Sequence, residues 1–156
     1  MSPKPQPYIN TRSDQPVRFL GSWTLVRSGR ENTNGAFCLV EQVIRGGFAS
    51  PYHVHRREDE AFYVLEGKIA VIADGKWIHA GPGDYVFGPR DVPHGFKAPG
   101  DTPARVLVVC APAGFDQFVL EMSEPEGTPP TPPDMAKLMA LASKYGIEIL
   151  GPLPEE

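Results

Sequence analysis

The residues best suited to chemistry in this 156-residue sequence are histidines gathered in two short segments. His53 and His55 are two positions apart, so on an extended strand both side chains point to the same face. Glu60 opens the next apolar run, and the charged RRED segment at 56–59 predicts a solvated turn that brings the two strands side by side. His94 needs only to lie on a neighbouring strand to complete a set of three imidazoles and one carboxylate.

This set predicts a site for one divalent transition metal ion. Neutral imidazoles and a carboxylate suit Fe, Mn, Ni, Co, Cu or Zn, whereas Ca and Mg prefer all-oxygen sites. Glu60 has two possible roles, as a structural ligand and as a base that accepts a proton from a substrate hydroxyl. The alternative is a polar interior satisfied by hydrogen bonds without metal. His79, the fourth histidine, matches no ligand position and is interpreted as an ordinary strand residue.

The elements that must position these residues are predominantly β-strands. Residues 17–112 consist of short apolar and β-branched runs separated by turn residues, and the chain holds 16 glycines and 18 prolines. This pattern favours an all-β fold, a small antiparallel β-barrel, over a helical bundle. Asp74-Gly75 predicts a tight hairpin, because this pair readily adopts positive φ angles.

The flanking segments differ from this pattern. Residues 1–16 carry four prolines and predict an extended arm. Residues 113–156 predict a helical extension with two short helices. The first has apolar residues at helical spacing over 115–122, and the second begins at about Asp134 and ends at Gly146. The prolines of 124–133 predict a linker without a regular element. We expect the helices either to cover the barrel or to shape the mouth of its cavity.

These motifs resemble those of the cupin superfamily. The first cupin motif has Gly, five residues, His-x-His, three or four residues, Glu, six residues and Gly. Every position is matched, by Gly47, His53, His55, Glu60 and Gly67. In the second motif Gly83, Pro89 and His94 match, but Asp91 stands in place of Gly and Ala98 in place of Asn. The resemblance covers residues 17–112 and implies a double-stranded β-helix of the jelly-roll type around a metal and a small ligand.

The resemblance also suggests a reaction, because single-cupin flavonol (quercetin) dioxygenases use a three-His-one-Glu set. If the ligands point inward, strand alternation sends Phe62 and Phe96 to the same side, where they can bind substrate or pack in the core. We predict a metal-dependent dioxygenase acting on a small enolisable or aromatic, flavonol-like substrate, with Glu60 as catalytic base. The alternatives are an isomerase or lyase, and a metal-stabilised binding protein without turnover.

Composition limits the partners. The net charge is -4, and no run of Lys or Arg is longer than Arg56-Arg57, which argues against binding to nucleic acid or an anionic membrane. The first 16 residues lack an apolar stretch, so we expect a cytoplasmic protein. Cys38 and Cys110 are then expected as buried free thiols, with a disulfide as the alternative. As many cupins are dimers, we also expect a homodimer in which the arm or first strand crosses to the partner.

Overall fold

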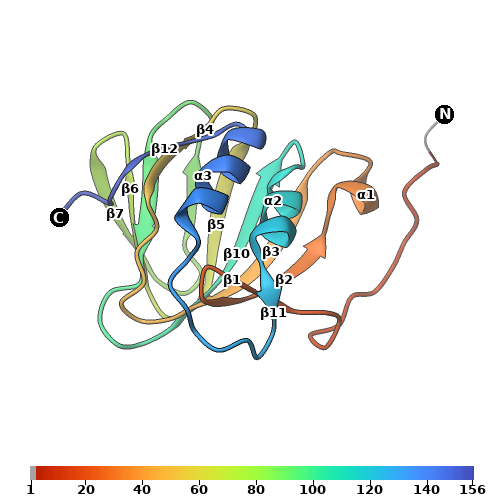
Figure 1. Ribbon diagram of the computed structural model, residues 1–156, viewed down its shortest axis with the longest axis horizontal. Coiled ribbons are helices and arrows are strands. Elements are labelled where there is room, and N and C mark those ends of the chain that lie inside the picture. The colour runs from red at the N-terminus through yellow and green to blue at the C-terminus, as the bar shows by residue number, and fades with distance from the viewer. Residues whose placement is uncertain (1–2) are drawn as a thin grey trace.

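Two antiparallel β-sheets face each other in the computed structural model, which describes residues 3–156 (Figure 1). The larger sheet has the order β11-β1-β2-β3-β10-β5-β8. Its strands are β11 (Glu124–Pro125), β1 (Val17–Phe19), β2 (Ser22–Ser28), β3 (Cys38–Ile44), β10 (Ala104–Ala111), β5 (Asp59–Glu66) and β8 (Tyr85–Gly88). The smaller sheet has the order β12-β4-β9-β6-β7. Its strands are β12 (Ile147–Gly151), β4 (Tyr52–His55), β9 (His94–Lys97), β6 (Ile69–Ala73) and β7 (Lys76–Ala80). The predicted all-β class is confirmed.

The core lies between the sheets because alternate residues of each strand turn inward. On β10, Val106, Val108 and Cys110 are buried, while the residues between them are partly exposed. Cys110 lies opposite Cys38 of β3 and Glu60 of β5, which fixes the register of the three central strands. Both cysteines are buried free thiols, as expected.

The β6–β7 hairpin confirms the turn predicted from Asp74-Gly75. Both residues have positive φ angles, 50° and 75°, and the flanking residues Ala73 and Lys76 pair with each other. Positive φ at two successive positions is the geometry of a two-residue turn whose twist matches that of the strands.

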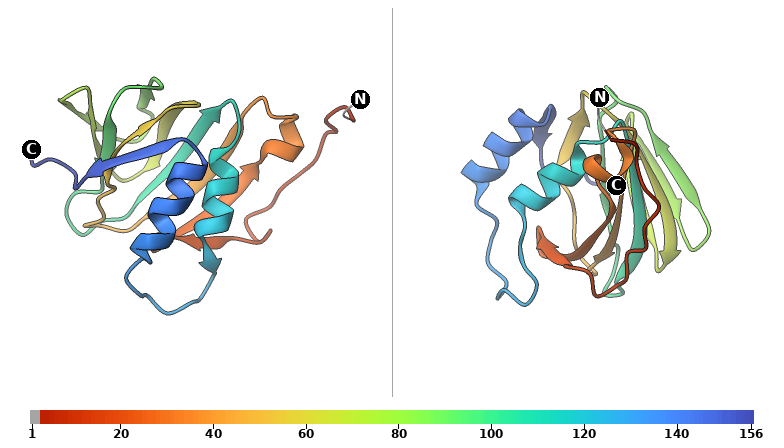
Figure 2. Two further views of the ribbon diagram at one scale, coloured as in Figure 1. Left: turned by 45° about the horizontal axis from the view of Figure 1, so that its top comes forward. Right: turned by 90° about the vertical axis from the view of Figure 1, so that its right-hand side faces the viewer.

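Helices α2 (Phe115–Met122) and α3 (Met135–Lys144) lie side by side on one flank of the sheets (Figure 2). The Asp134 side chain accepts a hydrogen bond from Lys137 N at 3.0 Å, and Gly146 follows α3 with a φ of 71°. The cap and the terminating glycine therefore act as predicted. A further single-turn helix, α1 (Arg30–Thr33), was not predicted.

Residues 3–16 form an extended arm that lies along β2 of the same chain. Arg27 donates hydrogen bonds to the backbone oxygen of Asn10 at 2.9 Å and to its side-chain oxygen at 2.8 Å, and Tyr8 donates to Arg27 O at 2.6 Å. These hydrogen bonds hold the polar arm against β2.

Two short strands correct the prediction for the end of the chain. Residues 124–133 were expected to hold no regular element, but Glu124 and Pro125 pair with Arg18 and Val17 of β1. The segment 113–156 is also more than a helical extension, because β12 pairs with β4 in the smaller sheet. The sheets therefore include strands on both sides of the boundary expected at residue 112.

None of the helices in residues 3–156 is long and apolar enough to cross a membrane.

Candidate metal centre

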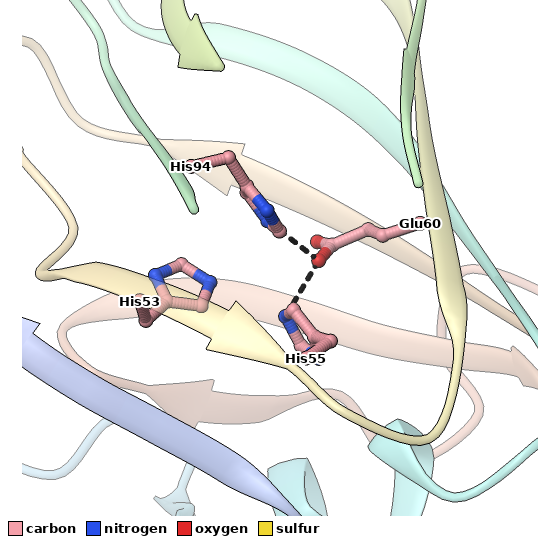
Figure 3. Close-up of side chains that lie close together, drawn as sticks. All are labelled: His53, His55, Glu60 and His94. Atoms are coloured by element: carbon pink, nitrogen blue, oxygen red, sulfur yellow. Dashed lines mark hydrogen bonds and ion pairs between the residues drawn. The ribbon is translucent and has the colours of Figure 1, made fainter. Parts of the chain in front are cut away.

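Four side chains from three strands converge between the two sheets (Figure 3). His53 and His55 come from β4, His94 begins β9 and Glu60 lies on β5 of the opposite sheet. One ligand atom from each residue lies within 4.8 Å of all the others. His53 and His94 are direct cross-strand partners, so the smaller sheet presents all three imidazoles as one group. The structure thus brings together the four residues expected to bind metal.

Each imidazole is oriented by a hydrogen bond from its Nδ1 atom. His53 Nδ1 lies 2.7 Å from Pro51 O, and His94 Nδ1 lies 3.3 Å from Val92 O. His55 Nδ1 lies 2.7 Å from a carboxylate oxygen of Glu58. Because these oxygens can only accept, Nδ1 donates in every case and each Nε2 is left for a metal ion.

Glu58 corrects the interpretation of the RRED segment as a solvated turn. The residue is only 3% exposed and its side chain contacts His55 on the side away from Glu60, whereas the adjacent Asp59 faces outward and pairs with Arg90 at 3.3 Å. A carboxylate that accepts from the distal nitrogen of a ligating histidine fixes the tautomer and makes the ligand more basic. In the sequence, Glu58 is recognisable only as an acidic residue three positions after His55. It stands among four successive charged residues, a pattern typical of an exposed turn.

The donor atoms fit a divalent cation. His55 Nε2 is buried and lies 2.7 Å from Glu60 Oε2, and His94 Nε2 lies 3.1 Å from the same oxygen. Two imidazole nitrogens turned toward one carboxylate oxygen need a proton or a metal ion between them. A first-row divalent ion suits nitrogen and oxygen donors of this kind.

The electrostatics of the cluster also favour a cation. Burial lowers the pKa of His53 to about 3, and the neighbouring His55 and His94 contribute to this shift. Burial acts against a charge on His55 too, but Glu60 and Glu58 outweigh it and raise its pKa to about 10. The Glu60 carboxyl is also buried, yet His55 and His94 hold its pKa well below the usual value. Glu60 is therefore an anion at neutral pH, as a metal ligand must be.

Asp91 preserves the turn in which the second cupin motif has glycine. Its φ angle is 67°, its backbone N–H donates to His55 O at 2.9 Å, and its carboxylate lies 3.2 Å from Arg56. Aspartate is among the residues that tolerate the left-handed conformation. The departure from the motif therefore leaves the path of the chain to His94 intact.

A cavity of about 70 Å³ adjoins the metal centre, and we call it the inner cavity. Its walls are mostly apolar and come from both sheets and both helices. The lining residues are Phe19, Leu20, Ser22, Gln42, Ile44, Phe48, Ser50, Pro51, His53, His55, Glu60, Phe96, Phe115, Phe118, Leu138, Ile147 and Ile149. Residues 115–149 thus contribute to the wall as well as covering the sheets.

The two aromatic residues expected to bind substrate occupy different positions. Phe96 lines the inner cavity. Phe62 points inward as alternation predicted, but it is 1% exposed, packs against the rings of His94 and Phe96, and is absent from the lining. Phe96 can therefore contact a ligand directly, whereas Phe62 packs behind Phe96 and cannot. His79 lies outside the site, is exposed and pairs with Glu156.

Comparison with known proteins agrees with the fold and the ligand set. Residues 39–110 match the family Cupin_2, described as a cupin domain. This chain carries a cupin domain. The match includes all four candidate ligands of the metal centre.

Individual relatives match this cupin domain over different shares of their own length. The chain is 28% identical over 98 residues to quercetin 2,3-dioxygenase from Bacillus subtilis, a match that covers 63% of this chain and only 29% of that protein. Among solved structures, KdgF from a Halomonas species superposes with a TM-score of 0.63 at 19% identity over 72% of this chain and 99% of its own. An RmlC-like cupin from Shewanella frigidimarina gives 0.62 at 23% identity over 72% and 96%. The structural matches show the shared fold.

Proposed function

We propose that this protein is a metal-dependent dioxygenase acting on a small enolisable substrate. The observation that carries the proposal is the position of Glu60, whose carboxylate both belongs to the metal centre and lines the inner cavity. A group in that position can meet a substrate oxygen and the metal ion at the same time. The partial similarity to a quercetin dioxygenase supports the same choice of reaction.

Different residues of the chain would bind the metal, accept the substrate proton and exclude water. His53, His55, His94 and Glu60 would hold one divalent transition metal ion, which supplies Lewis-acid and redox chemistry. The Glu60 carboxylate, ionised at neutral pH, accepts the proton of the substrate enol. The apolar walls, among them Phe96 and Phe115, keep water from the resulting enolate. The enolate carbon then forms a bond to dioxygen, the O–O bond and the adjacent C–C bond break, and Glu60 returns its proton, so that both oxygen atoms end in the two products.

The size of the inner cavity favours the enolisable substrate over a flavonol-like one. At about 70 Å³ it is smaller than the roughly 150 Å³ engineered cavity that accepts benzene. A three-ring flavonol exceeds this volume far more than a small diketone does. Flavonols therefore serve as the comparison compounds in the test.

The first experiment measures metal content of freshly purified protein and oxygen uptake after each candidate metal is restored. We expect one metal ion per chain and oxygen uptake with a diketone such as 2,4-pentanedione. Glu60→Gln should retain part of the metal but lose turnover, because an amide oxygen can ligate but cannot accept the proton. Glu66→Gln, on the same strand but exposed, is the matched control and should keep full activity.

Three results would count against the proposal. Full turnover by Glu60→Gln would remove Glu60 as the base. Conversion of the diketone by the metal-loaded protein without oxygen uptake would instead favour the isomerase or lyase alternative. Metal binding without turnover of any diketone or flavonol would leave the binding-protein alternative.

A further inference from the structure

The inner cavity has a second polar region at a distance from the metal centre. Outside the metal centre, its polar lining residues are Ser22 of β2, Gln42 of β3 and Ser50. Ser50 is already occupied, because its hydroxyl donates to Pro51 O at 2.9 Å and accepts from Phe96 N at 3.0 Å. Ser22 and Gln42 are different, and we call them the distal pair.

The hydroxyl of Ser22 lacks a partner. Within residues 3–156, two buried side-chain polar atoms form no hydrogen bond, namely Ser22 Oγ and His55 Nε2. Both residues line the inner cavity. Burying a polar atom without a partner is unfavourable, so such atoms are uncommon unless a ligand supplies the missing bond. His55 Nε2 has the metal ion as its expected partner, which leaves Ser22 Oγ to be explained.

Gln42 lines the same cavity and is also buried. Its side-chain nitrogen donates to Thr24 Oγ1 at 3.4 Å, which is a long bond, and Thr24 in turn donates to Ser22 O at 3.0 Å. The distal pair therefore belongs to one small polar group on the inner face of β2 and β3. A polar group set in an otherwise apolar wall fixes the orientation of a ligand in most binding cavities.

The strand register separates the distal pair from the metal centre. Glu60 lies opposite Cys110 of β10, and Gln42 lies opposite Val106 of the same strand. Four residues of β-strand span about 13 Å. A cavity of only about 70 Å³ that reaches residues this far apart is narrow. It suits a slender molecule better than a fused ring system.

The charges on the cavity wall determine whether the group bound at the distal pair can be ionised. None of the described residues that line the inner cavity is Lys or Arg. A carboxylate or phosphate at the distal pair would be buried without a counter-ion, which is strongly unfavourable. An uncharged hydroxyl or carbonyl needs only hydrogen-bonding groups, and a serine hydroxyl with an amide provides them.

We infer that Ser22 and Gln42 form a specificity subsite for an uncharged oxygen at the far end of the substrate. This inference rests on the proposed function for the identity of the cavity as a substrate site. It narrows the substrate to a slender molecule with a metal-binding oxygen function at one end, an apolar middle, and a hydroxyl or carbonyl at the other end.

The test uses hydroxamates, because they bind first-row metal ions whether or not the protein is a dioxygenase. Straight-chain hydroxamates of four to eight carbons, each with and without a terminal hydroxyl, are titrated into the Co(II)-loaded full chain. Binding is followed by the visible spectrum and by calorimetry. At one or two adjacent chain lengths we expect the hydroxylated compound to bind about tenfold more tightly than its unsubstituted partner, as a buried hydrogen bond allows.

The variants assign that preference to the distal pair. Ser22→Ala and Gln42→Met should bring the two affinities to within about twofold of each other. Ser22→Ala should also raise the melting temperature, because it removes a buried hydroxyl that has no partner. Ser123→Ala is the control, since its hydroxyl donates to Leu120 O outside the cavity, and it should keep the wild-type preference.

The outcomes separate this inference from the proposed function. If wild-type protein shows no preference at any chain length, or binds none of the hydroxamates, the subsite is refuted. An undiminished preference in Ser22→Ala and Gln42→Met, or a lower melting temperature for Ser22→Ala, also refutes it. A hydroxyl preference that depends on Ser22, in a protein that never consumes oxygen, would support the subsite and reject the dioxygenase.

Discussion

Removal of the Glu58 carboxylate should weaken metal binding although Glu58 is not a ligand. Its Oε1 atom lies 2.7 Å from His55 Nδ1, and its side chain is almost fully buried. Loss of such a partner behind a ligating histidine typically costs about 10- to 100-fold in metal affinity. This corresponds to about 1.4–2.7 kcal/mol. We therefore expect Glu58→Ala to bind Co(II) or Ni(II) 10- to 100-fold more weakly than wild type.

Glu58→Gln should lie between wild type and Glu58→Ala. Its amide oxygen can still accept from His55 Nδ1, but it lacks the negative charge that strengthens the hydrogen bond. Dissociation constants are measured by competition with a chromogenic chelator at pH 7.5, alongside thermal unfolding to verify that each variant is folded.

Asp59→Asn is the matched control for this series. It removes the neighbouring negative charge, but the Asp59 side chain faces outward and pairs with Arg90. Its metal affinity should equal that of wild type. If Glu58→Ala binds metal as tightly as wild type, or if Asp59→Asn loses as much affinity, the positioning role of Glu58 is wrong.

Further predictions concern the ligands, the sheets and the assembly. His53→Ala and His94→Ala should each purify without stoichiometric metal, which elemental analysis would show; unchanged content in both would reject the site. Ile147→Ala should lower the free energy of unfolding by about 2–4 kcal/mol in denaturant titrations, because its side chain is buried beside the ligand strand; a loss below 1 kcal/mol would contradict this. Glu41 is buried, but its two arginine partners hold its pKa below the usual value. Its ionised form therefore stabilises the fold above about pH 4.5, and the destabilisation by Glu41→Gln, about 1–2 kcal/mol at pH 7, should disappear as pH falls through the folded pKa. A destabilisation that does not shrink as pH falls below 4.5 would exclude the ion pairs as its cause. Light scattering at micromolar concentration should give the mass of a homodimer, and a monomer would reject the expected assembly.

The sequence was sufficient for the parts of the site that depend on local spacing. The two-residue interval between His53 and His55 places both imidazoles on one face of a strand whatever the rest of the chain does. The Asp74-Gly75 turn and the Asp134 cap are local for the same reason. Each needs only residues within a few positions, so each could be predicted before the fold was known.

Features that depend on pairing between distant segments were missed. Glu58 is buried only because β5 returns beneath His55, and its charged neighbours are those of an exposed turn. Strand β12 pairs with a segment almost 100 residues earlier, and five residues after a helix give little indication of that partner. For Phe62, alternation predicted the correct face, but the depth of the side chain behind Phe96 depends on packing between the sheets.

The pairing of β12 with β4 has a consequence for how the protein is made. The strand with His53 and His55 is synthesised long before residues 147–151, which cover one of its sides. Until those residues leave the ribosome, the N–H and C=O groups along that side have no partner, and an open edge of this kind can pair with a neighbouring chain. Because of this order of synthesis, the free edge of β4 can pair with another chain until residues 147–151 have been made. A delay between the codons for residues 55 and 147 would lengthen that interval.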